Sequence, residues 1–181
     1  MSVFCFRALL VGASLLSACR HAERRDVGAM RDDFGAAVSI NAAPQRIVSL
    51  NPTTTEVHFA IGAGSRLVGR SMYDAFPRSA LVVPNLGAAL RPNVEAIIGA
   101  KPDLVVLYAS QDNRAAADRL RQAGIATVAL RIDSIAQFER DTRLLGRLTG
   151  DSARANTVVD SVRATLDRVR AATQSLARPS V

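Results

Sequence analysis

Short apolar runs alternate with helical stretches through the middle of the chain. The apolar runs are rich in β-branched residues and predict strands at 46–50, 66–69, 104–108 and 126–130. The stretches between and after them predict helices at 52–61, 94–100, 113–123 and 134–148. Strands separated by helices of this length favour a parallel sheet with right-handed crossovers. We therefore expect an α/β lobe built on a parallel sheet.

The first of these helices has clear boundary residues. Asn51 can accept hydrogen bonds from the free amides of the first turn. Pro52 suits the first helical position, because the N–H that it lacks would have no partner there. Gly62 and Gly64 are expected to end the helix.

Two segments outside the main alternation have weaker patterns. Asp-Asp-Phe-Gly at 32–35 indicates a turn, and the short apolar segment 37–40 follows it, so a small hairpin is expected before the first main strand. Residues 73–84 contain two prolines and are expected to be irregular.

The last segment, 151–177, predicts one long helix. Apolar positions recur in it at alternating steps of three and four, at Val159, Val162, Leu166, Val169, Thr173 and Leu176. Such a helix would be about 40 Å long, more than a small domain needs to cover its sheet. The stripe also permits a coiled-coil dimer, although it spans fewer than four heptads.

The N-terminal residues have the order of a secretory signal. Arg7 precedes an apolar run at 8–16 that is too short to span a bilayer, and small residues follow. Leu-Ser-Ala-Cys at 16–19 resembles the lipobox of bacterial lipoproteins, which implies a signal peptide at 1–18 and a lipidated Cys19. An ordinary signal peptide with an incidental Cys19 is the alternative. The polar segment 19–31 would be the tether of an extracytoplasmic, lipid-anchored domain.

The amino-acid composition argues against several classes of protein. The chain has 181 residues, of which 49% are hydrophobic and 22% charged, which fits one globular domain. Its formal charge is +7, but Lys101 is the only lysine and the arginines are scattered, which favours a solvated basic surface over a nucleic-acid partner. The only cysteines are Cys5 and Cys19, and His21 and His58 have no metal-site spacing. We expect no metal, no cofactor and no enzymatic activity.

Five segments in order resemble a known family. They are RIVSLNPTTTE at 46–56, FAIGAG at 59–64, LVG at 67–69, PNVE at 92–95 and KPDLV at 101–105. Together they resemble the substrate-binding lipoproteins of bacterial ABC importers for cobalamin and ferric siderophores or heme. The resemblance implies two α/β lobes joined by a rigid helix, with the ligand between the lobes and an ABC permease as partner.

Placed on this chain, the resemblance implies an N-terminal lobe at 32–150, the connecting helix at 151–177 and the start of a second lobe at 178–181. Most of the second lobe would be absent. Three explanations are open: the second lobe lies on another chain, the reading frame is interrupted before it, or the first lobe works alone. The alternative function is an interaction or structural protein that uses its exposed helix.

Candidate ligand-binding residues follow the predicted strands, because ligands of such sheets bind beyond the carboxyl ends of the strands. They are Asn51, Ser71, Tyr73 and Tyr108, with Asp74 and Ser110 nearby, and Arg91 is added to them for its charge. Tyr73 matches an aromatic residue of the family's cleft, or is a half-buried loop tyrosine. Arg91 and Arg70 would neutralise an anionic chelate, or lie on the surface. Asn51 would serve as a cap, as a ligand contact, or as both.

Two further features come from the resemblance. Glu95 matches a family glutamate that docks on permease arginines, although a carboxylate in the first turn of a helix also suits the helix dipole. A pocket tryptophan of cobalamin-binding members has no counterpart near 87–90, which weakens cobalamin as the ligand.

Overall fold

The computed structural model describes residues 31–176 and contains a four-stranded parallel sheet. The strands are β1 (Ile47–Ser49), β2 (Leu67–Arg70), β3 (Leu104–Tyr108) and β4 (Ala126–Leu130). Their spatial order is β2-β1-β3-β4, and β3 and β4 pair residue by residue from Leu104↔Ala126 to Tyr108↔Leu130. This order reverses direction between β1 and β3, which defines a topological switch point at those two strands.

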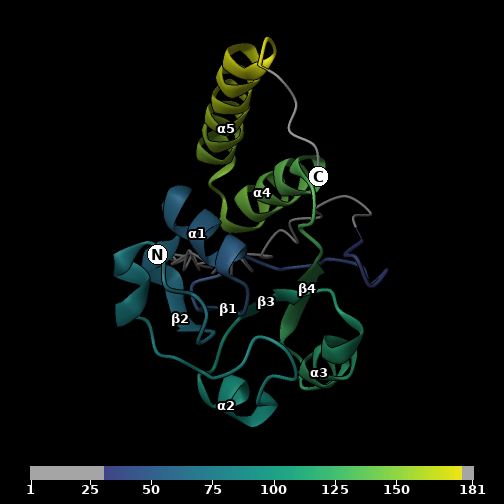
Figure 1. Ribbon diagram of the computed structural model, residues 1–181. Helices are drawn as coiled ribbons and strands as arrows, with labels where there is room; N and C mark the ends of the chain where they lie inside the picture. The colour runs from purple at the N-terminus through teal and green to yellow at the C-terminus, as the bar shows by residue number, and fades with distance from the viewer. Residues whose placement is uncertain (1–30, 177–181) are drawn as a thin grey trace, which may run out of the picture.

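Helices cover both faces of the sheet (Figure 1). Their bounds are α1 (Pro52–Ala60), α2 (Val94–Gly99), α3 (Gln111–Gln122), α4 (Ile135–Thr149) and α5 (Ser152–Thr173), with 3-10 turns η1 (Gly64–Arg66) and η2 (Arg78–Val82). Alternate strand residues point to opposite faces. Side chains such as Ile47 and Val106 therefore pack against α1 and α4, while Val48 and Val105 pack against α2 and α3.

Side-chain caps define several helix starts. Asn51 Oδ1 accepts from the backbone N–H of Thr53 at 2.8 Å, with Pro52 at the first helical position as predicted. Asn93 and Ser134 cap α2 and α4 in the same way. Each cap satisfies an amide that the helix itself leaves free.

Helix α5 is buried against α4 through its first turns. Gly150 has φ 84°, and this left-handed residue turns the chain between the two helices. A Cβ on Gly146 would lie 2.4 Å from Ala155 Cβ, so the close approach of α4 and α5 requires glycine there. Ala155 and Val159 are fully buried, whereas the distal half of α5 projects away from the lobe (Figure 1).

Several expectations need correction. The turn at 32–35 is present and Arg31 bridges Ala37, but residues 37–40 form no regular strand; Val38 and Ile40 are buried in the core. The segment 73–84 is not wholly irregular, because it contains η2. Helix α3 begins two residues earlier than predicted, and α5 ends at Thr173. The signal peptide, Cys19, residues 19–30 of the tether and residues 178–181 lie outside the described residues.

Within 31–176, no helix combines the length and apolarity needed to cross a membrane.

Candidate functional site: the carboxyl edge of the sheet

The segments that follow the strands meet at one edge of the sheet, which we call the carboxyl edge. The parallel order places Tyr73 after β2, Asn51 after β1, Tyr108 at the end of β3 and Asp133 after β4. The switch point lies in the middle of this series, between β1 and β3. The topology therefore brings most of the predicted ligand-binding residues to the edge where α/β sheets bind ligands.

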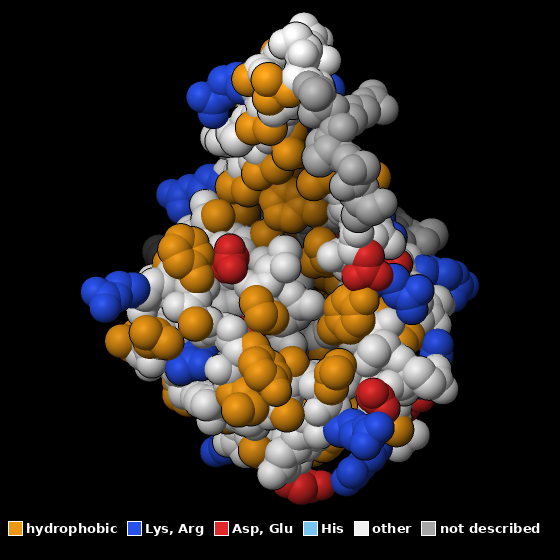
Figure 2. All heavy atoms as spheres, in the orientation of Figure 1, with side chains coloured by type: hydrophobic (Ala, Val, Ile, Leu, Met, Phe, Trp, Pro, Cys, Tyr) orange, Lys and Arg blue, Asp and Glu red, His pale blue; other side chains and the backbone are white. Residues whose placement is uncertain are grey.

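Large apolar side chains are exposed in the segment that follows β2. Tyr73 is 60% exposed and Phe76 is 65% exposed. The other members of this set, between 48% and 87% exposed, are Met72, Leu81, Val82 and Leu90. Figure 2 shows hydrophobic side chains spread over this face of the molecule, including its left side, where β2 lies in Figure 1. A group of exposed apolar side chains of this kind is typical of a binding surface, and we call it the apolar wall.

A buried hydrogen-bond network lies beneath Tyr73. Ser71 Oγ donates to Asp74 Oδ1 at 2.6 Å, and the backbone N–H of Tyr73 donates to Ser71 Oγ at 3.3 Å. Thr55 Oγ1 donates to Asp74 Oδ2 at 2.8 Å. Ser71, Thr55 and Asp74 are all fully buried. Ser71 was predicted to contact the ligand directly, but its hydroxyl faces this network, so its contribution to a site would pass through the turn that it holds.

The polar groups at the ends of β3 and β4 are joined to each other. Tyr108 Oη donates to Asp133 Oδ1 at 2.7 Å, and this bond to the carboxylate is the main cause that raises the pKa of Tyr108. Asn113 is buried on α3 and donates to the carbonyl oxygens of Tyr108 and Ala89. The buried hydroxyl of Ser110 has no partner among the described residues. Tyr108 therefore stays protonated over the whole neutral range, and its ring is held beside Asp133.

Both arginines predicted for an anionic ligand are already engaged. Arg91 forms an ion pair with Asp112 at 3.0 Å, and its side chain is largely exposed. Arg70 is buried, which neither interpretation of the sequence anticipated. Its guanidinium donates to the carbonyl oxygens of Val83 and Ser71, so it supports the loop and is not free for an anion.

Glu95 lies in the first turn of α2, at the face of the lobe formed by α2 and α3. Its carboxylate forms an ion pair with Arg119 of α3 at 2.8 Å, and both side chains are more than half exposed. A carboxylate at this position also interacts favourably with the helix dipole. Glu95 is thus accessible to a partner while it is bonded to Arg119.

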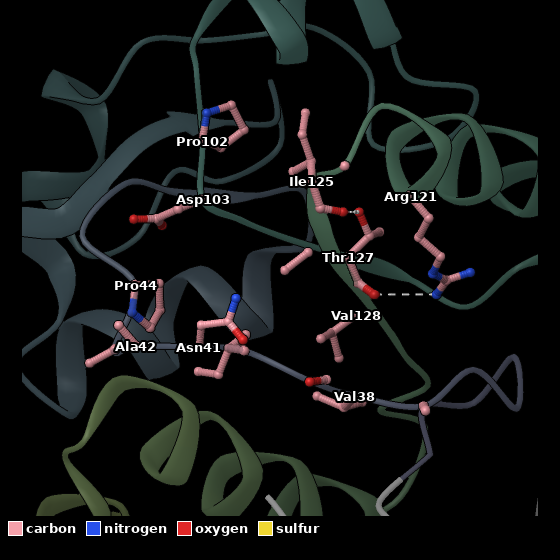
Figure 3. A pocket seen from close by; sticks show the side chains of 16 residues that line it. Val38, Asn41, Ala42, Pro44, Pro102, Asp103, Arg121, Ile125, Thr127 and Val128 are labelled. Carbon is pink, nitrogen blue, oxygen red and sulfur yellow. Dashed lines mark hydrogen bonds between the residues drawn. The ribbon is translucent and has the colours of Figure 1, made fainter. Parts of the chain in front are cut away.

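A cavity of about 670 Å³ lies at the opposite edge, beside the amino ends of β3 and β4 (Figure 3). It is bordered by residues 37–44 and by β4. Asp103 accepts hydrogen bonds from the backbone of Gln45 and Arg46, and Arg121 is paired with Asp32. The charged groups of this cavity therefore serve the fold, and none of the predicted site residues borders it.

Sequence reasoning did not identify the apolar wall or the partners of Asp74. The apolar residues of the wall lie in a segment without periodicity, so no pattern marked them as exposed. No local sequence pattern predicts that Thr55 is a hydrogen-bond partner of Asp74 either. Asp74 was named as a polar residue after β2, but its burial depends on β1 and α1, which lie elsewhere in the sequence.

The fold is that of one lobe of the solute-binding class: a parallel α/β sheet with exposed apolar side chains in the segment that follows β2. The model of the periplasmic binding protein family matches residues 47–181, and the chain belongs to this family. This finding confirms the family to which the sequence segments were compared.

Three similar proteins place the chain within the family. It is 28% identical over 186 residues to the ABC transporter substrate-binding lipoprotein YvrC of Bacillus subtilis, with 94% of this chain and 59% of that protein covered. It is 32% identical over 158 residues to the cobalamin-binding protein of Halobacterium salinarum, with 83% and 42% covered. The solved structure of the periplasmic heme-binding protein RhuT from Roseiflexus sp. RS-1 superposes with a TM-score of 0.70 at 26% identity, with 75% and 52% covered. The chain thus spans about half the length of these proteins.

Proposed function

We propose that this chain is the ligand-binding N-terminal lobe of an extracytoplasmic solute-binding protein that delivers a metal chelate to an ABC importer. The observation that carries the proposal is the apolar wall around Tyr73 at the carboxyl edge, in a chain that belongs to the periplasmic binding protein family. The lobe binds its ligand by contact and transfers it without chemical change. Asn51, Arg91 and Tyr108 would supply the polar contacts around the wall.

The surface supports a macrocyclic chelate, cobalamin or heme, more than a strongly anionic ferric siderophore. Exposed aromatic and aliphatic side chains pack well on a flat ring. An anionic chelate needs free cations, but Arg70 is bonded to backbone carbonyl groups and Arg91 to Asp112. The names of the cobalamin-binding and heme-binding relatives agree with this preference.

We further propose that Glu95 docks on the importer and that Cys19 carries the lipid anchor. Glu95 is exposed and is not one of the residues of the apolar wall, so docking and ligand binding can be tested separately. An acylated Cys19 would hold the lobe at a membrane surface, within reach of a permease.

The test of ligand binding is a calorimetric and absorbance titration of the full chain with cyanocobalamin, heme and a ferric tricatecholate. We expect saturable binding of cyanocobalamin or heme, and much weaker binding of the tricatecholate. One wall covers less of a ligand than the 70–90% typical of a closed site, so micromolar affinity is the expected order. Absence of binding by all three would refute the proposed ligand class.

A second function is favoured by the distal half of α5. Val169 is 55% exposed and Leu176 is 63% exposed on the apolar stripe that begins at the buried Val159. An interaction protein could use this stripe to pair with a second lobe or with another copy. Sedimentation equilibrium tests this alternative, since a concentration-dependent dimer that Val169→Glu abolishes would support it.

A further inference from the structure

Asp74 is a fully buried carboxylate at the base of the apolar wall. Three hydrogen bonds reach its two oxygens: one from Thr55 Oγ1 at 2.8 Å, one from the backbone N–H of Ser71 at 3.0 Å, and one from Ser71 Oγ at 2.6 Å. All three donors are neutral groups. A buried carboxylate is costly unless its oxygens are hydrogen-bonded, so these donors are what make its position tolerable.

The other buried aspartates of the described residues are held differently. Asp32 is paired with Arg121, and Asp141 is paired with Arg140. Asp74 has no ion-pair partner in the described part of the chain. The negative charge of Asp74 nevertheless acts on a neighbour: the pKa of Glu56 is raised first by the burial of Glu56 and then by the charge of Asp74. Charge pairing therefore does not explain why an aspartate occupies this position. The arrangement of the three hydrogen bonds to its carboxylate does.

The network around Asp74 connects three elements of the lobe. Thr55 belongs to α1, and its Oγ1 also lies 2.8 Å from Ser49 Oγ on β1. Ser71 directly follows β2, and its hydroxyl accepts the backbone N–H of Tyr73. The carboxylate thus ties the turn that carries Tyr73 to the rigid strand and helix beside it. Tyr73 itself is 60% exposed and has little packing of its own to hold it.

We propose that Asp74 is the positioning residue of the binding surface: through Ser71 it fixes the turn 71–74 and so presents the ring of Tyr73 in one orientation to the ligand. The inference rests on the proposed role of Tyr73 as a ligand contact. Holding a side chain in its bound geometry before the ligand arrives removes an ordering cost from binding. Loss of Asp74 would therefore weaken binding without removing any ligand contact.

The composition of the chain offers a direct test of this positioning. It contains no tryptophan and two tyrosines, Tyr73 and Tyr108, so Tyr108→Phe leaves Tyr73 as the only tyrosine whose fluorescence is observed. In that background we expect Asp74→Asn to lower the fluorescence anisotropy of Tyr73 and to increase its quenching by acrylamide. Ser71→Ala removes the connecting hydroxyl and should reproduce both changes.

The matched control is Asp141→Asn, which removes a buried carboxylate of α4 that takes no part in the network. It should lower the melting temperature to a similar degree but leave the anisotropy of Tyr73 unchanged. With Tyr108 intact, Asp74→Asn should weaken binding of cyanocobalamin or heme by about tenfold, a loss of the size expected when one or two side chains lose their preorganisation. Asp141→Asn should not change the affinity.

The outcomes separate this inference from the proposed function. If the unaltered chain binds neither probe, the proposed function fails, and the anisotropy of Tyr73 still decides whether Asp74 positions it. If Asp74→Asn and Ser71→Ala destabilise the lobe while the anisotropy and the affinity stay as in the unaltered chain, Asp74 is a structural residue only and the inference is wrong. If Asp74→Asn does not fold, Ser71→Ala and Thr55→Val carry the same measurements.

Discussion

The guanidinium of Arg163 on α5 forms a bidentate ion pair with the carboxylate of Glu139 on α4. Hydrogen bonding from Arg163 lowers the pKa of Glu139, and the same pair raises the pKa of Arg163. The pair lies beyond the last fully buried contact of α5, at Val159. It therefore adds a contact between α4 and α5 beyond the turns that are packed together.

Loss of this ion pair should loosen α5. We expect Arg163→Gln to lower the melting temperature at low salt, and the loss to shrink at 1 M salt, because ions screen exposed charges over about 3 Å at that concentration. Arg168→Gln is the matched control, since among the described residues Arg168 hydrogen-bonds only to Thr165 of its own helix. Equal melting curves for the two variants would show that the pair does not hold α5.

His58 should make the lobe sensitive to acid. It is fully buried in α1, its Nδ1 lies 2.6 Å from the Thr54 carbonyl oxygen, and its Nε2 has no partner among the described residues. Burial lowers its pKa from 6.5 to about 4. A histidine whose pKa is lowered by folding adds stability above pH 6.5, and this stability is lost as the pH falls towards 4.

The size of this effect is about 3 kcal/mol between neutral pH and pH 4. Carboxylates also titrate in this range, so the measurement is a difference: urea unfolding of the unaltered chain and of His58→Gln at both pH values. The unaltered chain should lose about 3 kcal/mol more than the variant. A parallel loss in the two proteins would assign the acid sensitivity to other groups.

Tyr73 should contribute much of the binding energy of the apolar wall. We expect Tyr73→Ala to weaken binding of cyanocobalamin or heme at least tenfold, as truncation of a central aromatic contact commonly does. Val169→Ala, an exposed apolar side chain on α5, is the control and should leave the affinity unchanged. Unchanged calorimetric affinity in a folded Tyr73→Ala variant would remove Tyr73 from the site.

Glu95 should affect transport without affecting ligand binding. Glu95→Arg places a repulsive charge where permease arginines are expected, so it should abolish stimulation of the importer ATPase in nanodiscs. The affinity for the ligand should stay the same. Asp118→Arg reverses another exposed carboxylate on α3 and serves as the control. If both substitutions, or neither, reduce stimulation, the specific role of Glu95 is refuted.

Cys19 should be the site of acylation. Metabolic labelling with a palmitate analogue should mark the unaltered chain, and Cys19→Ser should abolish the label because no other cysteine follows the predicted signal peptide. Persistent labelling of the variant would place the anchor at a different residue.

Local patterns predicted most of the secondary structure. The bounds of β3 and β4 agree with the predicted 104–108 and 126–130. A short apolar run that includes β-branched residues is typical of a buried strand. Asn51 was correctly predicted as a cap, because its partner is the amide of Thr53, two residues away. Such features depend on neighbours in the chain, and a sequence displays these directly.

The tertiary structure decided which polar groups are buried and which apolar groups are exposed. Arg70 ends β2 and Asp74 lies in the turn that follows, so both could have faced solvent or ligand, but the Val83 carbonyl and the Thr55 hydroxyl hold them inside the lobe. The long helix α5 was predicted from its apolar stripe, yet Val169 on this stripe stays exposed because no described element covers it. By itself the sequence determined the α/β alternation and the family, since both depend on local order and motifs. The carboxyl edge, its apolar wall and the network beneath Tyr73 arise only when distant segments meet, because burial is a property of the packed chain.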